Sequence, residues 1–166
     1  MSSENTAAIP TKEELIDLLR NGKIGEFNRV RPAGEIDLYG ANLCGANLWK
    51  ADLRRADLTG VSLIRADLNK ADLTRANLTR AYLTGANLDE ASLVSADLHG
   101  ANLTEANLAG GNLTGANLTG ASLVGANLTG ANLTRANLTG AYIIEVKGLS
   151  EERRRLIVES LQKSWK

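Results

Sequence analysis

The sequence predicts an all-β solenoid with a helix at each end, and three observations support that prediction. Residues 36–140 repeat every five residues in one register, and the unit Ala-(Asp/Asn)-Leu-x-x recurs 21 times. Leu holds the third place of each unit, from Leu38 to Leu138. A period of five matches neither the 3.6 residues of a helical turn nor the two-residue alternation of a strand. It is typical of a chain that turns a corner at every unit and so winds into a solenoid.

The pattern of apolar places within the unit predicts the core. The first place is Ala in 19 of 22 units, the exceptions being Ile36, Val61 and Gly111. The other places are mostly polar or Gly, so Leu and Ala are expected to face inward. If each unit forms one side, four consecutive units close a quadrilateral coil. Residues separated by four units then stack, and Asn87, Asn107 and Asn127 are expected to form a ladder.

Residues 1–35 lie outside the repeat and predict a disordered tail followed by an N-terminal capping helix. Thr11 and Glu14 have the spacing of a capping box, and the apolar stripe of residues 15–19 follows them. Asn21-Gly22 is a stop signal. A second short element is expected over residues 24–30. An open solenoid end exposes core and unpaired backbone, so we expect this helix to cover the first coil.

Residues 36–145 form the predicted solenoid, including a last altered unit that begins at Ala141, and residues 146–166 are again non-repetitive. Ser150 can cap a helix over residues 151–163. Leu156, Ile157 and Leu161 are expected to form its apolar side. Two interpretations of this helix stay open, because it can cover the last coil or form a dimer contact.

The composition limits the classes of partner and the location. The chain has 166 residues with 19 basic and 19 acidic side chains, so no overall field attracts nucleic acid or an anionic membrane. We see no apolar segment long enough to cross a bilayer and no apolar core of a signal peptide near residue 10. Cys44 is the single cysteine, which excludes an internal disulfide. These features favour a cytoplasmic protein.

No group of residues indicates catalysis, a cofactor or a metal. Cys44 and the single histidine, His99, are expected on adjacent sides and nearly three coils apart, too far for a catalytic pair. No cluster of His, Cys or carboxylates has metal-ligand spacing. The most basic stretch, residues 50–80, contains seven Lys or Arg interleaved with four Asp. It is either a solvated, ion-paired face or a patch for an acidic partner.

One side of the predicted solenoid combines outward places with apolar residues. If four units close a coil, these residues share that side and form a possible interaction face: Cys44, Ile64, Tyr82, Val124, Tyr142 and Ile144. A contiguous apolar stripe on a solenoid wall can mark a partner surface. The alternative is a set of scattered surface residues, which is normal for soluble proteins.

The uninterrupted array of residues 36–145 resembles the pentapeptide-repeat family. The resemblance implies a right-handed quadrilateral β-helix with the third- and first-place residues inside. It implies no single activity: many members, abundant in photosynthetic bacteria, have none assigned. A minority resemble B-DNA in size and charge, protect DNA gyrase from inhibitors, and form dimers through the C-terminal end. Those members tend to be strongly acidic with frequent central Phe, whereas this array has ten acidic and eight basic residues and no central Phe.

The leading functional hypothesis is therefore a non-enzymatic structural scaffold or protein-interaction module. Its partner is expected to be a protein that the sequence does not identify, with no nucleic acid or membrane involved. The chain is expected to be a monomer or a homodimer through its C-terminal end. The alternative function is that of a DNA mimic that interacts with gyrase, a topoisomerase.

Overall fold

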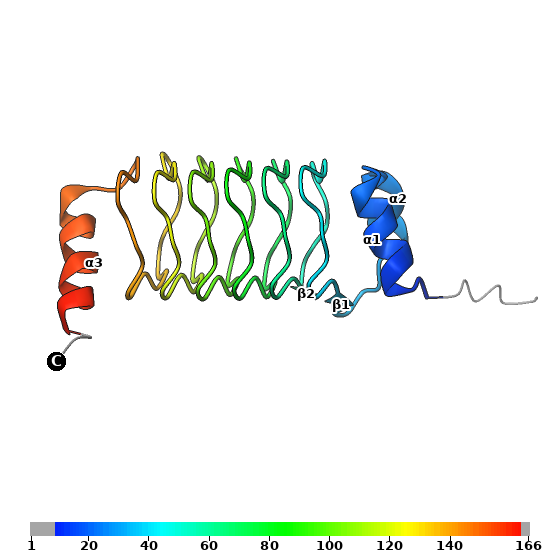
Figure 1. Ribbon diagram of the computed structural model, residues 1–166, viewed down its shortest axis with the longest axis horizontal. Helices are drawn as coiled ribbons and strands as arrows, with labels where there is room; N and C mark the ends of the chain where they lie inside the picture. Colours follow the sequence, from blue (N-terminus) through cyan, green and yellow to red (C-terminus); the bar gives the residue numbers. More distant parts are fainter. Residues whose placement is uncertain (1–8, 164–166) are drawn as a thin grey trace, which may run out of the picture.

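The computed structural model describes residues 9–163 as a stack of coils with helices across both ends (Figure 1). Helices α1 (Lys12–Arg20) and α2 (Ile24–Val30) lie at the N-terminal end. Strands β1 (Ile36–Asp37) and β2 (Ala56–Asp57) begin the first two coils, and helix α3 (Glu151–Lys163) lies at the other end. The tail predicted for the first residues falls outside the described range, apart from Ile9, which is exposed.

Adjacent coils pair in parallel with a constant offset of four units. Ile36 pairs with Ala56, and the pairing continues at second places from Asn42 with Ser62 to Asn127 with Lys147. This offset confirms four units per coil. Only β1 and β2 reach two residues, because a chain that turns within each unit has few residues left to extend. The β-helix is therefore built largely from single paired residues and turns.

Each corner is a tight turn over the fourth and fifth places. In the first unit the Ala41 N–H donates to the Leu38 carbonyl at 3.1 Å. The residue between them at the fifth place, Gly40, has a φ of 65°. Within the array positive φ occurs only at fifth places, which is the pattern of a type II turn. The second-place carboxylate supports the corner, since Asp37 Oδ1 accepts the Tyr39 N–H at 2.9 Å.

The core is the column of third-place leucines with first-place residues beside it, as the sequence predicts. The leucines from Leu38 to Leu128 are at most 1% exposed. Exposure rises only in the last coil, to 4% at Leu133 and 7% at Leu138. No charged or polar residue is buried as a whole within the described part of the chain, although the side chain of Arg31 is only 7% exposed. Burial of this leucine column is the main apolar contribution to stability.

The predicted asparagine ladder is present and has a direction. Asn127 Nδ2 donates to Asn107 Oδ1 at 3.1 Å, and Asn107 Nδ2 donates to Asn87 Oδ1 at 3.2 Å. Asn87 Nδ2 then donates to Asp67 Oδ1 at 2.9 Å. The ladder therefore ends on a carboxylate, which accepts without having to donate.

Helix α1 begins and ends where the sequence predicts. Thr11 and Glu14 form the reciprocal capping box, and Gly22 follows the C-cap Asn21 with a φ of 67°. Leu15 and Leu19 of α1 and Phe27 of α2 are buried in the same cluster as the first coils. The two helices thus extend the apolar column beyond the first coil.

Side chains of α1, α2 and the following segment also replace hydrogen bonds that a preceding coil would make. In an internal coil, second- and fourth-place carbonyls accept N–H groups from the coil before. The first coil has no such neighbour. Three of its carbonyls instead accept from side chains: Tyr39 from Lys12 at 3.1 Å, Asn42 from Arg20 at 3.4 Å, and Arg54 from Arg31 at 3.0 Å.

At the other end the register continues two residues past the expected boundary, because Val146 is buried and Lys147 pairs with Asn127. Gly148 then connects to α3 with a φ of 80°, and a Cβ there would lie 2.4 Å from Thr129 N. Ser150 Oγ caps α3 by accepting the Arg153 N–H at 3.3 Å.

The apolar side predicted for α3 is wrong in one respect. Ile157 is buried, but Leu156 is 55% exposed. Adjacent helical residues point about 100° apart. Ile157 joins the core cluster, whereas Leu156 lies at its edge and lines a hollow with Ala136 and Leu138. The side chain of Leu161 lies outside the described part of the chain.

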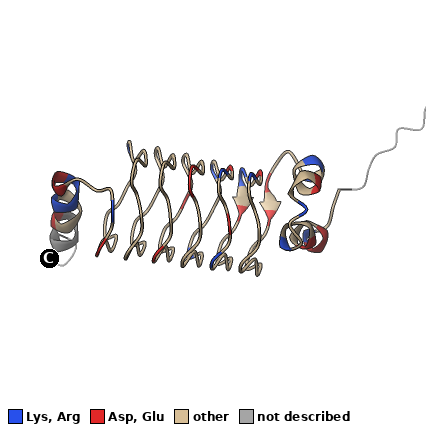
Figure 2. Cartoon of the chain, turned by 90° about the horizontal axis from the view of Figure 1, so that it is seen from above, with Lys and Arg blue, Asp and Glu red and all other residues tan. Residues whose placement is uncertain are grey.

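The charged residues are unevenly distributed along the solenoid (Figure 2). They gather in the helices and in the coils near α1 and α2, whereas residues 106–134 contain none. Among the described helices, none combines the length and apolar character needed to span a membrane.

Candidate functional site

The register places the predicted interaction face on one side of the solenoid, and we call it the apolar wall. It comprises Cys44, Ile64, Tyr82, Val124, Tyr142 and Ile144. Tyr82 and Tyr142 hold second places that pair with Ser62 and Ser122 of the preceding coils. The other four hold fourth places of the same column and are separated from one another by whole coils. These places face outward because the intervening third place is buried.

The large side chains of the apolar wall are exposed, at 37% for Ile64, 53% for Tyr82, 57% for Tyr142 and 62% for Ile144. Val124 is half-buried, and Cys44 is exposed. The wall is not continuous, because Thr84, Asn102 and Thr104 lie between its two groups. Cys44, Ile64 and Tyr82 form one group in the first three coils, and Val124, Tyr142 and Ile144 form the other.

The environments of Cys44 and His99 suit surface residues. Cys44 Sγ lies 2.8 Å from Ser62 Oγ, with either atom able to donate. His99 is exposed and stands nearly three coils further along, about 13 Å of rise at strand spacing. Within residues 9–163 no group of three or more His, Cys, Asp or Glu could hold a metal ion.

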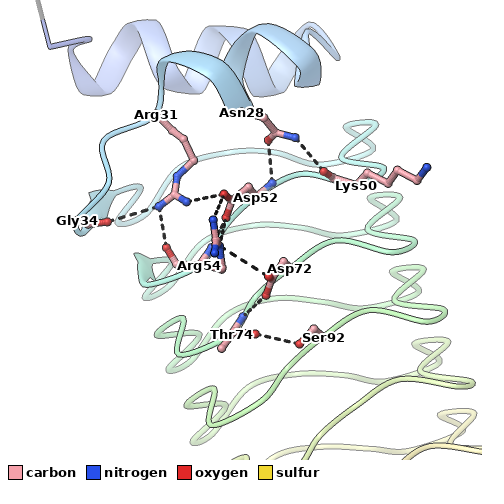
Figure 3. Close-up of polar contacts among 9 residues, drawn as sticks. All are labelled: Asn28, Arg31, Gly34, Lys50, Asp52, Arg54, Asp72, Thr74 and Ser92. Atoms are coloured by element: carbon pink, nitrogen blue, oxygen red, sulfur yellow. Dashed lines mark hydrogen bonds and ion pairs between the residues drawn. The ribbon is translucent and has the colours of Figure 1, made fainter.

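The most organised polar cluster joins α2 to the first coils, and we call it the clasp: Arg31, Asp52 and Arg54 (Figure 3). Asp52 Oδ2 lies 2.7 Å from Arg31 Nη1 and also 2.7 Å from Arg54 Nη2. Arg54 Nε donates to Asp52 Oδ1 at 2.8 Å. The Arg31 side chain is only 7% exposed, and that of Asp52 is 22% exposed. Two guanidinium groups therefore share one carboxylate at the junction.

The clasp shifts the titration of its members. Hydrogen bonds from Arg54 and then Arg31, with the charge of Arg31, hold the pKa of Asp52 far below its usual range despite partial burial. The same bond to Asp52 raises the pKa of Arg54. Hydrogen bonds from Lys12 and from the Tyr39 N–H likewise lower the pKa of the exposed Asp37 carboxyl. The ionised forms are thus favoured at both contacts between the N-terminal segment and the first coil.

Sequence reasoning missed the roles of Arg31 and Asn28. Asn28 Oδ1 accepts the Asp52 N–H at 2.8 Å, and its Nδ2 donates to the Lys50 carbonyl at 3.0 Å (Figure 3). The Asn28 Oδ1 thus takes the place of the backbone carbonyl that a preceding coil would offer to the Asp52 N–H. No repeat pattern marks it, and the only local signal was the Arg31-Pro32 step that precedes the array.

The basic stretch is only partly ion-paired. Arg54 also lies 3.7 Å from Asp72, and Lys70 lies 3.4 Å from Glu90. Among the described residues no carboxylate within 4.0 Å accompanies the other basic side chains of this stretch: Lys50, Arg55, Arg65, Arg75 and Arg80. The Lys50 ammonium instead lies 4.2 Å from the centroid of the Trp49 ring.

A sequence model described as pentapeptide repeats matches eight copies, over residues 36–75, 71–110 and 112–147. The chain belongs to the pentapeptide-repeat family. The match spans the same residues as the stacked coils, so the family accounts for the solenoid and not for the flanking helices.

Several solved structures are similar to this pentapeptide-repeat protein. One is a pentapeptide repeat protein of the Arabidopsis thaliana thylakoid lumen, 34% identical over 63% of this chain and 75% of that chain, with a TM-score of 0.49. Another is HetL of Nostoc sp. strain PCC 7120, involved in heterocyst differentiation regulation, 31% identical over 68% and 65%, with a TM-score of 0.35. A third, from the cyanobacterium Cyanothece 51142, is 39% identical over 58% and 63%, with a TM-score of 0.32. No curated protein matches the chain.

Proposed function

We propose that this pentapeptide-repeat protein is a non-enzymatic scaffold that binds a protein partner through the apolar wall. The observation that supports the proposal is the exposure of Ile64, Tyr82, Tyr142 and Ile144 on one side of a regular solenoid. Aromatic side chains such as tyrosine are enriched where proteins bind one another and among the residues that contribute most to binding. A surface held by hydrogen bonds at every coil loses little freedom when it binds, which favours affinity.

The proposal includes several finer expectations. The coils wind in the right-handed sense, and α1 and α2 act as a cap that prevents other chains from pairing with the first coil. The protein works in the cytoplasm of a bacterial cell, and neither nucleic acid nor a membrane takes part. It acts as a monomer or as a homodimer through the C-terminal end.

The test is affinity capture from cells that make the protein, followed by mass spectrometry. The variant Ile64→Glu with Val124→Glu adds a charge to each group of the apolar wall. A matched control, Thr129→Glu with Thr134→Glu, adds the same charges at exposed fourth places on two other sides. Circular dichroism melting should show all three proteins folded, because none of these side chains belongs to the buried column.

The proposal expects a captured protein that binds the parent and the control but not the charged wall variant. Equal capture by the wall variant would remove the apolar wall from the binding site. Turnover of a small molecule by the purified protein, with no partner captured, would overturn the proposal. Inhibition or protection of gyrase supercoiling by the purified chain would instead support the topoisomerase alternative.

A further inference from the structure

A cleft of about 470 Å³ lies against the clasp, on the side of the solenoid opposite the apolar wall. It is lined by Arg31, Arg54, Arg55 and Arg75, with Thr74 and Ser95 among the other lining residues. The register explains the grouping, because Arg54 and Thr74, and Arg55 and Arg75, hold equivalent places in successive coils. Each coil has four sides, one per unit. The units that line the cleft come two units after those of the apolar wall, so they form the opposite side.

The charges around this cleft are not balanced locally. No acidic residue lines it, and Asp52 and Asp72 are the carboxylates that pair with its arginines. Four guanidinium charges thus meet two carboxylates. Glu35 and Asp57 line an adjacent hollow together with Arg55 and Arg75, yet neither lies within 4.0 Å of those guanidinium groups.

Arg55 and Arg75 are also a neighbouring basic pair, and among the described residues neither has a carboxylate within 4.0 Å. Stacked coils place their backbones about 4.8 Å apart, and like charges at adjacent positions repel. The comparable column of Lys50 and Lys70 continues to Glu90, which pairs with Lys70. The column of Arg55 and Arg75 continues to Ser95, which has a hydroxyl and no charge.

Arg31 adds a further positive charge beside the same cleft. Its side chain is 7% exposed, and its Nε is a buried donor with no hydrogen-bond partner among the described residues. Buried donors without acceptors are rare in native proteins. This Nε is closed to the cleft, so Arg31 contributes its positive charge there and not a hydrogen bond from Nε. The cleft beside Arg31 is of a volume typical of ligand sites, about 300–1,000 Å³.

We infer that this cleft binds a dianionic phosphate group, held chiefly by Arg55 and Arg75. Guanidinium groups present parallel N–H donors that match the oxygens of phosphate in a bidentate manner. Thr74 and Ser95 can donate hydroxyl hydrogens to further oxygens. A bound dianion would offset the repulsion between the two arginines. The inference does not depend on the proposed function, because the apolar wall lies on the opposite side.

The experiment is a titration followed by NMR of the arginine Nε–H signals, with calorimetry for affinity. The probes are inorganic phosphate, a neutral peptide with one phosphoserine, and the same peptide with serine or glutamate instead. The test variant is Arg55→Gln with Arg75→Gln. The control is Arg65→Gln with Arg80→Gln, because these arginines also hold fifth places with positive φ, at 56° and 55°, but have glycine in the next coil.

The expected result is phosphate-dependent shifts at Arg55 and Arg75, with affinity about tenfold or more weaker in the test variant because two charge-assisted interactions are lost. The control should stay within about twofold of the parent. Tighter binding of the phosphoserine peptide than of inorganic phosphate would assign the group to a partner protein, and equal binding would assign it to a small phosphate compound. Three results would overturn the inference: phosphate affinity weakened equally in the test and control variants, glutamate and phosphoserine peptides binding equally well, or no binding of any phosphate probe.

Discussion

The substitution Asp52→Asn isolates the charge that the clasp depends on. Asparagine keeps an Oδ1 that can accept the Arg54 N–H, which lies 3.3 Å from the carboxylate, so the corner is preserved. It removes the negative charge between Arg31 and Arg54, each 2.7 Å away. The buried Arg31 guanidinium then retains only backbone carbonyls as acceptors, those of Arg54 at 3.0 Å and Gly34 at 3.5 Å.

The expected loss of stability follows from the burial of each partner. Removing one member of a buried ion pair costs about 3–5 kcal/mol, and a hydrogen bond to a charged group contributes about 1.5–3 kcal/mol. The Arg54 side chain is 55% exposed, so water can replace the lost carboxylate, and the Arg54–Asp52 ion pair adds little to the stability. We therefore expect Asp52→Asn to lower the stability of the junction by about 2–3 kcal/mol, mostly through Arg31.

The same charge predicts a pH dependence with a definite sign. The folded state holds the pKa of Asp52 below the 3.8 of an aspartate in the unfolded chain, so the ionised clasp stabilises the protein at all pH values above 3.8. This contribution is lost as the pH falls through the lowered pKa. The stability difference between the parent and Asp52→Asn should thus be constant near neutral pH and shrink in strong acid.

Native-state hydrogen exchange is the assay, because it resolves local opening. Solenoid coils contact only their neighbours, so the α1 and α2 amides should lose protection while the central coils keep theirs. The matched control is Asp72→Asn, at the same place one coil on, because Asp72 is 42% exposed and lies 3.7 Å from Arg54. It should change stability by less than about 0.5 kcal/mol. An effect of Asp52→Asn no larger than that of Asp72→Asn would refute the reasoning.

Three further substitutions test the core, the C-terminal connection and the ladder. Leu88→Ala should cost about 3–5 kcal/mol in urea unfolding, because Leu88 is fully buried in the middle of the column; a loss below about 1 kcal/mol would contradict an axial leucine. Gly148→Ala should release α3, seen as lost exchange protection, because its Cβ would lie 2.4 Å from Thr129 N. Gly120→Ala is its control, since it shares a positive φ but has open space, and it should cost only about 1 kcal/mol. Asn107→Ala should cost about 1–2 kcal/mol by thermal unfolding, because it removes an acceptor from Asn127 and a donor from Asn87.

The repeat made much of the fold predictable, because a strict period determines both the burial and the neighbours of each place. The buried leucine column, the four-unit offset between coils and the ladder from Asn127 to Asn87 all follow from it. The helices also followed from local signals, such as the capping box at Thr11. Those signals act within a few residues and so can be recognised without knowing the fold.

The contacts at both ends of the solenoid were not predictable, since they join segments with no shared period. Nothing near Asn28 indicates that it replaces a backbone partner of Asp52, 24 residues away. At the other end, the sequence could not decide which of Leu156 and Ile157 faces the last coil, because that depends on how α3 is placed.

The separation of core places from surface places explains how such a chain can combine different surfaces. Third-place leucines and first-place residues form the buried column, whereas second- and fourth-place side chains lie outside it. Tyr82 and Ile64 can therefore be exposed on one side, and Arg54 and Arg75 can line a cleft on the opposite side, without a conflict in the core. Both surfaces begin in the first three coils, next to the end that α1 and α2 contact. The relative position of the cleft and the apolar wall depends on the order of the N-terminal end of the solenoid. The clasp at Asp52 contacts the cleft directly, and it supports the apolar wall only through the coils that the two surfaces share.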